Sequence, residues 1–133
     1  MKTSNPLAEL DRIAKKLGQK NQKAVKPVAE RDVVKSIRHI LELKNCFVVK
    51  MHGSNFSRAG MPDLLVLAPM YQRGDCSMVL PRAVFLEVKT PSGKLSKLQA
   101  ETLKKLNDLG FTAACVNSAP AALAVVFKDH AYL

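Results

Sequence analysis

The sequence predicts an α/β domain in which a central mixed sheet of about four strands is flanked by helices. Short apolar runs with the length of a strand alternate with longer segments whose apolar residues recur at helical spacing. The expected order is helix, three strands, helix, strand, helix, and 133 residues are enough for one domain with its own core. This order is typical of a layered α/β architecture.

The helices are predicted by periodicity and by residues typical of helix ends. Apolar residues from Val28 to Leu41 trace one face of a helix that ends near residue 44. A second helix is expected at 97–110, with Ser96 as its cap and Gly110 as its stop. Pro120 is typical of a first helical turn, so a last helix is expected from there to about residue 128.

The strands are predicted by short runs of β-branched, aromatic and other apolar residues. They are expected at 46–51, 64–69, 83–90 and 111–117. The run at 64–69 has no polar residue, which predicts a strand buried on both faces. Residues 70–81 contain Gly74, Asp75 and Pro81 and are expected to form a loop.

The charge balance is the most informative feature of the composition. Lys and Arg number 21 against 11 Asp and Glu, so the formal net charge is +10 and the pI is near 9.8. Such a charge favours a polyanionic partner, although charge alone does not separate nucleic acid from an anionic membrane surface. No apolar stretch approaches the roughly 20 residues of a membrane span. DNA is therefore the expected partner, and no membrane association is expected.

The cysteines and the known sequence motifs exclude several other classes of site. Cys46, Cys76 and Cys115 are odd in number, far apart and in no metal-ligand pattern, which favours free thiols in a reducing, cytoplasmic setting. The polar, basic N-terminus does not resemble a secretory signal. The sequence contains no P-loop, no Gly-rich dinucleotide fingerprint and no HExxH, so no nucleotide cofactor is expected.

Residues 1–26 are expected to form a basic N-terminal arm, and residues 27–133 the folded domain. The arm has seven basic and two acidic residues, which account for half of the net charge of +10. Leu7, Leu10 and Ile13 lie at helical spacing and predict a short helix at about 5–17, with Gly18 as its stop. Two interpretations remain open, namely a solubilising tail and an arm that contacts DNA or clasps a second subunit.

Two charged residues interrupt the expected strand at 83–90. Side chains alternate across a strand, so Phe85, Glu87 and Lys89 share one face while Val84 and Leu86 lie on the other. Charges on a central strand are costly unless they are paired or used. A plain Glu–Lys pair that faces solvent is the simpler interpretation, because a bare Glu-x-Lys is common.

Asp63 brings a second carboxylate toward this pair. If the strands at 64–69 and 83–90 pair antiparallel, the start of one lies beside the end of the other, and Asp63 lies next to Glu87 and Lys89. Converging carboxylates repel unless a cation lies between them, and hard oxygen ligands suit Mg²⁺ or Mn²⁺. A cation that polarises a phosphoryl oxygen, together with a lysine, suits phosphodiester hydrolysis. The alternative for Asp63 is a turn-forming residue after a proline.

Three runs of the sequence are informative together, namely Gly60–Leu65, Phe85–Lys89 and Leu95–Gln99. They resemble the virus-type replication-repair nuclease (VRR-NUC) domain of the PD-(D/E)xK nuclease superfamily. The family pattern is a helix with an acidic residue, Gly-x-Pro-Asp before a strand, Glu-x-Lys at the end of the next strand, and a glutamine early in the following helix. The resemblance covers about residues 27–127 and implies a PD-(D/E)xK restriction-endonuclease-like core.

The resemblance implies a role for each matching residue. Asp63, Glu87 and the carbonyl of Val88 would bind the metal ion, Mg²⁺ or Mn²⁺. Lys89 would be the catalytic lysine, and Gln99 would line the site near the lysine or the scissile phosphate. Without the resemblance, Gln99 would be interpreted as a surface residue of its helix.

The resemblance also covers residues around this set. Glu30 matches the acidic residue of the first helix and could reach a metal ion directly or through water, although a first-turn glutamate is also favoured by the helix dipole. Gly60 and Pro62 would shape the turn that presents Asp63.

Polar residues in two loops are candidates for contacts with the DNA backbone. They are Ser54, Asn55, Ser57 and Arg58 before Asp63, together with Lys94 and Lys97 before Gln99. Each is equally compatible with an ordinary exposed position. His52 lies near these loops, and a lone histidine is more typical of a hydrogen-bonded structural group, so it is not assigned as a base.

The leading hypothesis is a metal-dependent, structure-specific endodeoxyribonuclease. Small stand-alone members of the family resemble viral or prophage proteins and junction-resolving homodimers, which implies a Holliday-junction resolvase in a bacterial host. The alternatives are a non-catalytic DNA-binding module, a flap- or end-directed nuclease, and a hydrolase of a small phosphorylated molecule. A pure binder gains nothing from carboxylates that face phosphates, and +10 is excessive for a small substrate.

Overall fold

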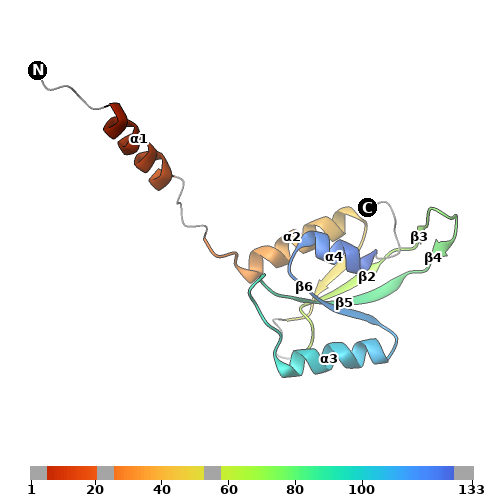
Figure 1. Ribbon diagram of the computed structural model, residues 1–133. Helices are drawn as coiled ribbons and strands as arrows, with labels where there is room; N and C mark the ends of the chain where they lie inside the picture. Colours follow the sequence, from red (N-terminus) through yellow and green to blue (C-terminus); the bar gives the residue numbers. More distant parts are fainter. Residues whose placement is uncertain (1–5, 21–25, 53–57, 128–133) are drawn as a thin grey trace, which may run out of the picture.

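The computed structural model describes residues 6–20, 26–52 and 58–127 of the chain. Helix α1 (Pro6–Lys20) stands away from the body of the molecule (Figure 1). The body contains the helices α2 (Glu30–Leu43), α3 (Lys97–Asp108) and α4 (Ala119–Val126), and the strands β1 (Phe47–Lys50), β2 (Leu64–Ala68), β3 (Tyr71–Gln72), β4 (Met78–Val79), β5 (Arg82–Val88) and β6 (Thr112–Val116). None of the described helices is both long and apolar enough to cross a membrane.

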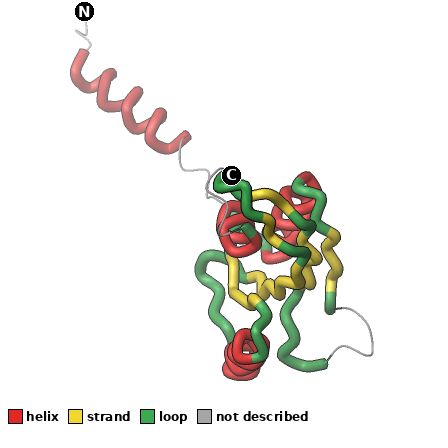
Figure 2. Tube along the Cα trace, turned by 90° about the vertical axis from the view of Figure 1, so that its right-hand side faces the viewer, coloured by secondary structure: helices red, strands yellow, loops and turns green. Residues whose placement is uncertain are grey.

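The main sheet is mixed and has the strand order β1-β2-β5-β6. β1 and β2 pair antiparallel, as do β2 and β5, while β6 runs parallel to β5 after the crossover through α3. Helices α2 and α4 cover one face of the sheet and α3 covers the other (Figures 1 and 2). The predicted α/β class and the antiparallel pairing of the second and third long strands are confirmed.

The main core lies between the sheet and the helices α2 and α4. Val84, Leu86 and Val88 of β5 are fully buried in the same cluster as Ile37 and Leu41 of α2. Burying each such side chain contributes about 1.5–3 kcal/mol, so this face fixes β5 firmly. Because side chains alternate, the intervening residues of β5 are directed toward the other face, where α3 lies.

Helix α3 is held at both ends by side-chain hydrogen bonds. The Ser96 hydroxyl accepts from the backbone N–H of Gln99, and the Gln99 side chain accepts from the backbone N–H of Ser96, which forms a capping box. At the other end, Asn107 donates to the carbonyl of Ala113 and accepts from its N–H, which ties α3 to β6. Gly110 has a φ of +95° and ends this segment, as predicted.

The expectation that the strand at 64–69 is buried on both faces is wrong. Leu64, Val66 and Ala68 are buried in the main core, but Leu67 is 43% exposed on the opposite face. Helix α3 packs mainly against β6, at the other edge of the sheet, and leaves this part of β2 uncovered.

Two further boundaries differ from the predictions. The segment 70–81, expected as a loop, contains the short β3–β4 hairpin, whose turn is closed by Asp75 accepting from the N–H and the hydroxyl of Ser77. Helix α1 continues through Gly18 to Lys20 instead of stopping at the glycine. One glycine costs a helix about 1 kcal/mol, which neighbouring helix-forming residues can offset.

Candidate active site

The carboxylate of Asp63 lies between two neighbouring strands. Its Oδ2 atom accepts a hydrogen bond of 2.8 Å from the backbone N–H of Val88, at the end of β5. Its Oδ1 atom lies 3.5 Å from Nε2 of His52, which follows β1. The antiparallel pairing of β2 with both neighbours brings these strand ends together. Asp63 is therefore held by its neighbours at the position that the sequence predicted.

Glu87 is the only charged residue among the buried residues of the described part of the chain, with an exposed fraction of 1%. Its Oε1 atom accepts from Nε2 of Gln99 at 2.6 Å and from Nζ of Lys89 at 3.0 Å. Its Oε2 atom is buried without a hydrogen-bond partner in the described ranges. A buried carboxylate oxygen without a partner is costly, so this atom marks a place where a ligand would be stabilising.

The surroundings of Glu87 disfavour its charged form. Burial raises the pKa of this carboxyl; the hydrogen bond from Lys89 opposes the rise, and the negative charge of Asp63 adds to it. A divalent cation near the free oxygen would remove much of this penalty, because it would stabilise both carboxylates at once.

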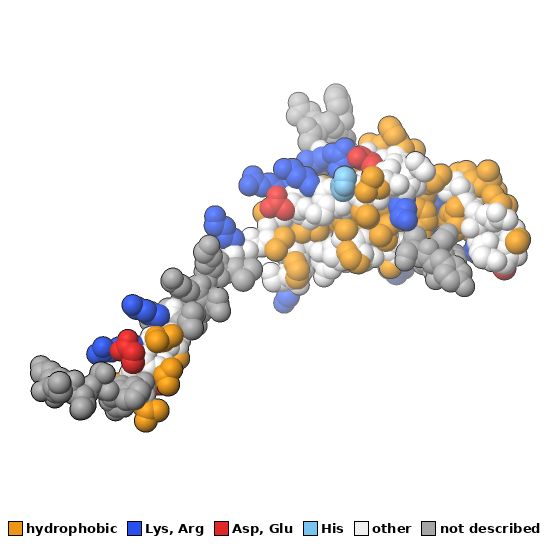
Figure 3. Space-filling view, turned by 90° about the horizontal axis from the view of Figure 1, so that it is seen from above, with side chains coloured by type: hydrophobic (Ala, Val, Ile, Leu, Met, Phe, Trp, Pro, Cys, Tyr) orange, Lys and Arg blue, Asp and Glu red, His pale blue; other side chains and the backbone are white. Residues whose placement is uncertain are grey.

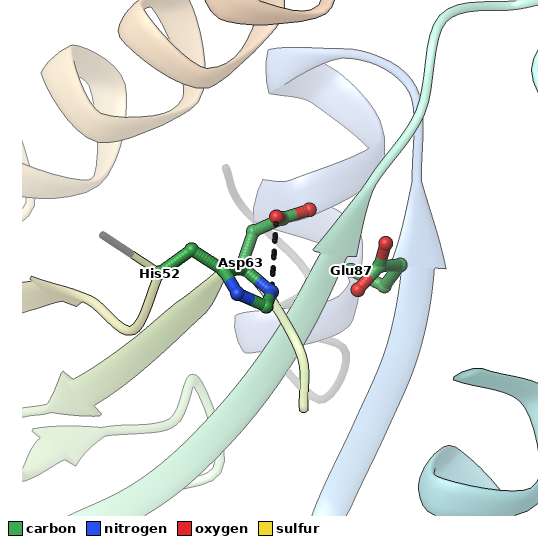
Figure 4. Close-up of side chains that lie close together, drawn as sticks. All are labelled: His52, Asp63 and Glu87. Carbon is green, nitrogen blue, oxygen red and sulfur yellow. Dashed lines mark ion pairs between the residues drawn. The ribbon is translucent and has the colours of Figure 1, made fainter. Parts of the chain in front are cut away.

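The donor atoms present fit a divalent cation. His52, Asp63 and Glu87 each offer one ligand atom, and these atoms lie within 4.8 Å of one another. Figure 4 shows His52 and Asp63 facing each other, with Glu87 on the strand beyond. The carbonyl of Val88 belongs to the same side of β5 as its N–H, which donates to Asp63, because the two groups of one strand residue point the same way. The two carboxylates and the carbonyl are oxygen ligands of the kind that Mg²⁺ and Mn²⁺ take, whereas the imidazole favours a transition metal.

His52 is the residue of this group that sequence reasoning missed. The prediction treated it as a structural histidine, yet its ring nitrogen lies beside Asp63. The pairing of β1 with β2 carries the signal: the N–H of Met51 donates to the carbonyl of Asp63 at 2.8 Å, so the residue after Met51 must lie near Asp63.

Lys89 lies at the end of β5, where it meets carboxylates from two elements. Its ammonium is 3.0 Å from Oε1 of Glu87 and 3.9 Å from Oε2 of Glu30, at the start of α2. Burial acts to lower the pKa of Lys89, but the hydrogen bond and charge of Glu87, with the charges of Glu30 and Asp63, outweigh it and raise the pKa. Lys89 is therefore a fixed cation beside the carboxylates, and Glu30 lies within its reach.

Gln99 connects the helix cap to the active-site carboxylate. Its Oε1 atom accepts from the backbone of Ser96, while its Nε2 atom donates to Glu87. Both ends of the amide are thus engaged, so the side chain cannot rotate freely. This arrangement fixes the orientation of Glu87 and leaves its second oxygen available.

The predicted DNA-contacting residues that the structure describes do not line the part of the site around Asp63 and Glu87. Ser54, Asn55 and Ser57 lie outside the described residues. Arg58 is exposed and lines a groove against α3, away from the cleft that contains Asp63. Lys97 is exposed and lies 4.0 Å from Glu101, and Lys94 follows Gly93, which lines a small cavity with Lys89. Among the residues that the structure describes, Arg58, Lys94 and Lys97 form no ion pair with Asp63 or Glu87. Their role in DNA binding stays a prediction.

The turn before Asp63 depends on glycine, and this leads to a testable expectation. Gly60 has a φ of +81°, and a Cβ atom there would lie 2.6 Å from Cγ of Leu98. We expect Gly60→Ala to lower the free energy of unfolding by about 1–3 kcal/mol, because it adds backbone strain and displaces α3 from the turn. Urea denaturation of the purified variant measures this loss.

Gly110→Ala is the matched control for this substitution. Gly110 also has a positive φ, of +95°, but a Cβ atom there would meet nothing within 4 Å. It should therefore show the backbone cost alone. Equal destabilisation by the two variants would mean that the contact between the turn and α3 is unimportant.

Two comparisons with known proteins found matches to this chain. The family model of the VRR-NUC domain matches residues 6–120. A solved structure described as a VRR_NUC domain has a TM-score of 0.57 and 27% identity, and the similarity covers 77% of this chain and 97% of that one. No curated protein matches the chain. The family match begins at residue 6, in α1, whereas the resemblance seen in the sequence begins at about residue 27. The predicted boundary between the N-terminal arm and the folded domain, after residue 26, stays a prediction. The matched range spans most of the sequence, and the chain therefore belongs to the VRR-NUC domain family of DNA-processing nucleases.

Proposed function

We propose that this protein is a divalent-cation-dependent endodeoxyribonuclease with Asp63, Glu87 and Lys89 at its active site. The observation that carries the proposal is the buried Oε2 atom of Glu87, which has no partner in the described part of the chain. Glu87 also belongs to the group of possible metal ligands with Asp63 and His52. A module that only binds DNA would gain nothing from such an atom. In an enzyme, a bound cation would supply the missing partner of the buried carboxylate and offset the cost of burying it.

In this proposal, some side chains of the site bind the cation and others stabilise the negative charge of the phosphate. Asp63, Glu87 and the carbonyl of Val88 would hold Mg²⁺ or Mn²⁺, with His52 at the edge of the group. The bound cation supplies Lewis acidity for hydrolysis of a phosphodiester. Glu30 lies across Lys89 from Glu87 and helps to hold the ammonium in place.

Lys89 supplies a positive charge that does not depend on the cation. Its ammonium is held by Glu87 and Glu30, so it is already oriented before the substrate arrives. A preorganised cation stabilises charge that develops on the phosphate in the transition state. Gln99 acts as a positioning residue, because its amide holds Glu87 by one oxygen.

The preferred substrate in this proposal is a four-way DNA junction, cut in the cytoplasm of a bacterial host by a homodimer. A net charge of +10 and an aromatic content of 5% without tryptophan favour recognition of the backbone and of DNA shape over base stacking. Two active sites related by a two-fold axis suit paired, symmetric nicks.

Cleavage of a panel of labelled DNA substrates tests this proposal. The panel contains a four-way junction, a flap, a linear duplex and a single strand, each incubated with Mg²⁺, with Mn²⁺ and with EDTA. Paired nicks in the junction, dependent on the cation and accompanied by a dimer in light scattering, are the expected result. Preferred cutting of flaps or ends would overturn the resolvase assignment but keep the nuclease. Tight binding without any cutting would indicate a non-catalytic module.

A further inference from the structure

A cleft adjoins the carboxylates, and its basic residues take no part in the proposed chemistry. It lies between α2 and the end of β1 and encloses about 380 Å³. Its lining includes Arg31, Lys35, Arg38 and Lys50, while its acidic residues are Glu30 and Asp63. Both acids belong to the active site, so the cleft is acidic at the catalytic end and basic along the rest.

The basic residues of α2 follow one face of the helix. Arg31, Lys35 and Arg38 are separated by four and three residues, which places them in a row. The row extends about 10 Å along the helix axis, at about 1.5 Å per residue. Figure 3 shows blue side chains gathered along this part of the body. A row of this length can face consecutive phosphates of one DNA strand.

The cleft contains more positive charge than its own acids neutralise. Neither Lys35 nor Lys50 forms an ion pair within the described ranges. Arg38 is 3.5 Å from Glu42, and its side chain remains 43% exposed. The pair of Arg31 with Asp32, at 4.0 Å, is exposed, and such pairs contribute little. The cleft therefore has free donors for an anionic ligand.

We propose that this basic cleft binds the sugar-phosphate backbone of the DNA strand on the α2 side of the scissile phosphate. Lys35, Arg38 and Lys50 contact phosphates of this strand, which leads past His52 to Asp63. The contacts are to phosphates, so they set the position of the strand and are independent of base sequence. The identification of the anionic ligand as DNA rests on the proposed nuclease function.

The test compares DNA binding and cutting by two double variants of equal charge. The cleft variant is Lys35→Gln with Lys50→Gln, and the control is Lys104→Gln with Lys105→Gln on α3, which covers the opposite face of the sheet. Fluorescence anisotropy with a labelled junction and a labelled duplex in EDTA measures affinity between 50 and 200 mM salt (about the range over which such affinities fall steeply). All four lysines are exposed, and circular dichroism checks that both variants fold.

The cleft variant is expected to bind both DNAs at least about tenfold more weakly than wild type. The slope of log affinity against log salt concentration should fall by the amount that corresponds to about two phosphate contacts. The control should lose much less affinity and keep its salt dependence. Equal losses in the two variants would overturn the cleft assignment, even if wild type cuts DNA normally. Selective loss of binding in the cleft variant, in a protein that never cuts DNA, would keep the cleft and reject the nuclease proposal.

Discussion

Glu87→Gln is expected to lower the rate of DNA cleavage by about 10³-fold or more while DNA binding is kept or strengthened. The substitution removes one of the two charges that would hold the cation, so the loss is comparable to that of a group acting directly on the transition state. Binding does not fall, because a negative charge that faces phosphates is removed. Single-turnover cleavage and anisotropy on the same labelled junction measure the two effects separately.

The same change at an exposed position is the control. Glu101 lies on α3, where it pairs with Lys97 at 4.0 Å, and Glu101→Gln should cut DNA at the wild-type rate. The hydrogen bond from Gln99 to Glu87 adds a second check, because the amide introduced at position 87 can still accept it. Full cutting by Glu87→Gln would remove Glu87 from the active site.

Lys89→Met is expected to slow cleavage by about 10²–10³-fold with little change in the affinity for DNA. Methionine keeps most of the aliphatic length of the side chain but removes the charge that stabilises the transition state. The effect should therefore appear in kcat and leave KM nearly unchanged. Steady-state cleavage at several junction concentrations separates the two parameters.

Lys104→Met provides the comparison for this variant. Lys104 forms an ion pair of 2.6 Å with Asp108 on the exposed surface of α3, so the same substitution removes a paired lysine far from the proposed chemistry. Its cleavage rate should match that of wild type. If Lys89→Met instead raised KM and left kcat unchanged, Lys89 would be a binding residue and not a catalytic one.

The framework of the active site could be predicted from the sequence because it depends on strand order and strand alternation. Alternation alone places Glu87 and Lys89 on one face, and an antiparallel neighbour that starts at Asp63 brings the second carboxylate close. The structure has this pairing, with the N–H of Val88 donating to Asp63. The capping residue Ser96 was also predictable, because serine before an apolar helix is a local signal.

The parts that the sequence did not reveal depend on contacts between separate elements. The proximity of His52 to Asp63 follows from the register of β1 against β2, which no local pattern specifies. The hydrogen bond from Gln99 to Glu87 requires the distance between α3 and the sheet. The exposure of Leu67 arises because α3 covers one edge of the sheet more than the other.

The basic cleft was missed for a related reason. The sequence suggests DNA contacts in the loops around Asp63 and Gln99, where polar residues are conspicuous. The residues that line the cleft with Asp63 come instead from one face of α2 and from Lys50. On a helix, basic residues at this spacing are also typical of an ordinary solvated face, and only the packing of α2 beside β1 directs them toward the catalytic carboxylates.

The central claim, that Asp63 and Glu87 together hold a divalent cation, is tested most directly by calorimetric titration of Mn²⁺ into the protein without DNA. Wild type and Lys89→Met should bind the ion at a common site, because Lys89 is not a ligand. Asp63→Asn and Glu87→Gln should lose this binding while keeping the wild-type fold by circular dichroism. Unchanged Mn²⁺ binding in both carboxylate variants, or no binding in wild type, would contradict the account.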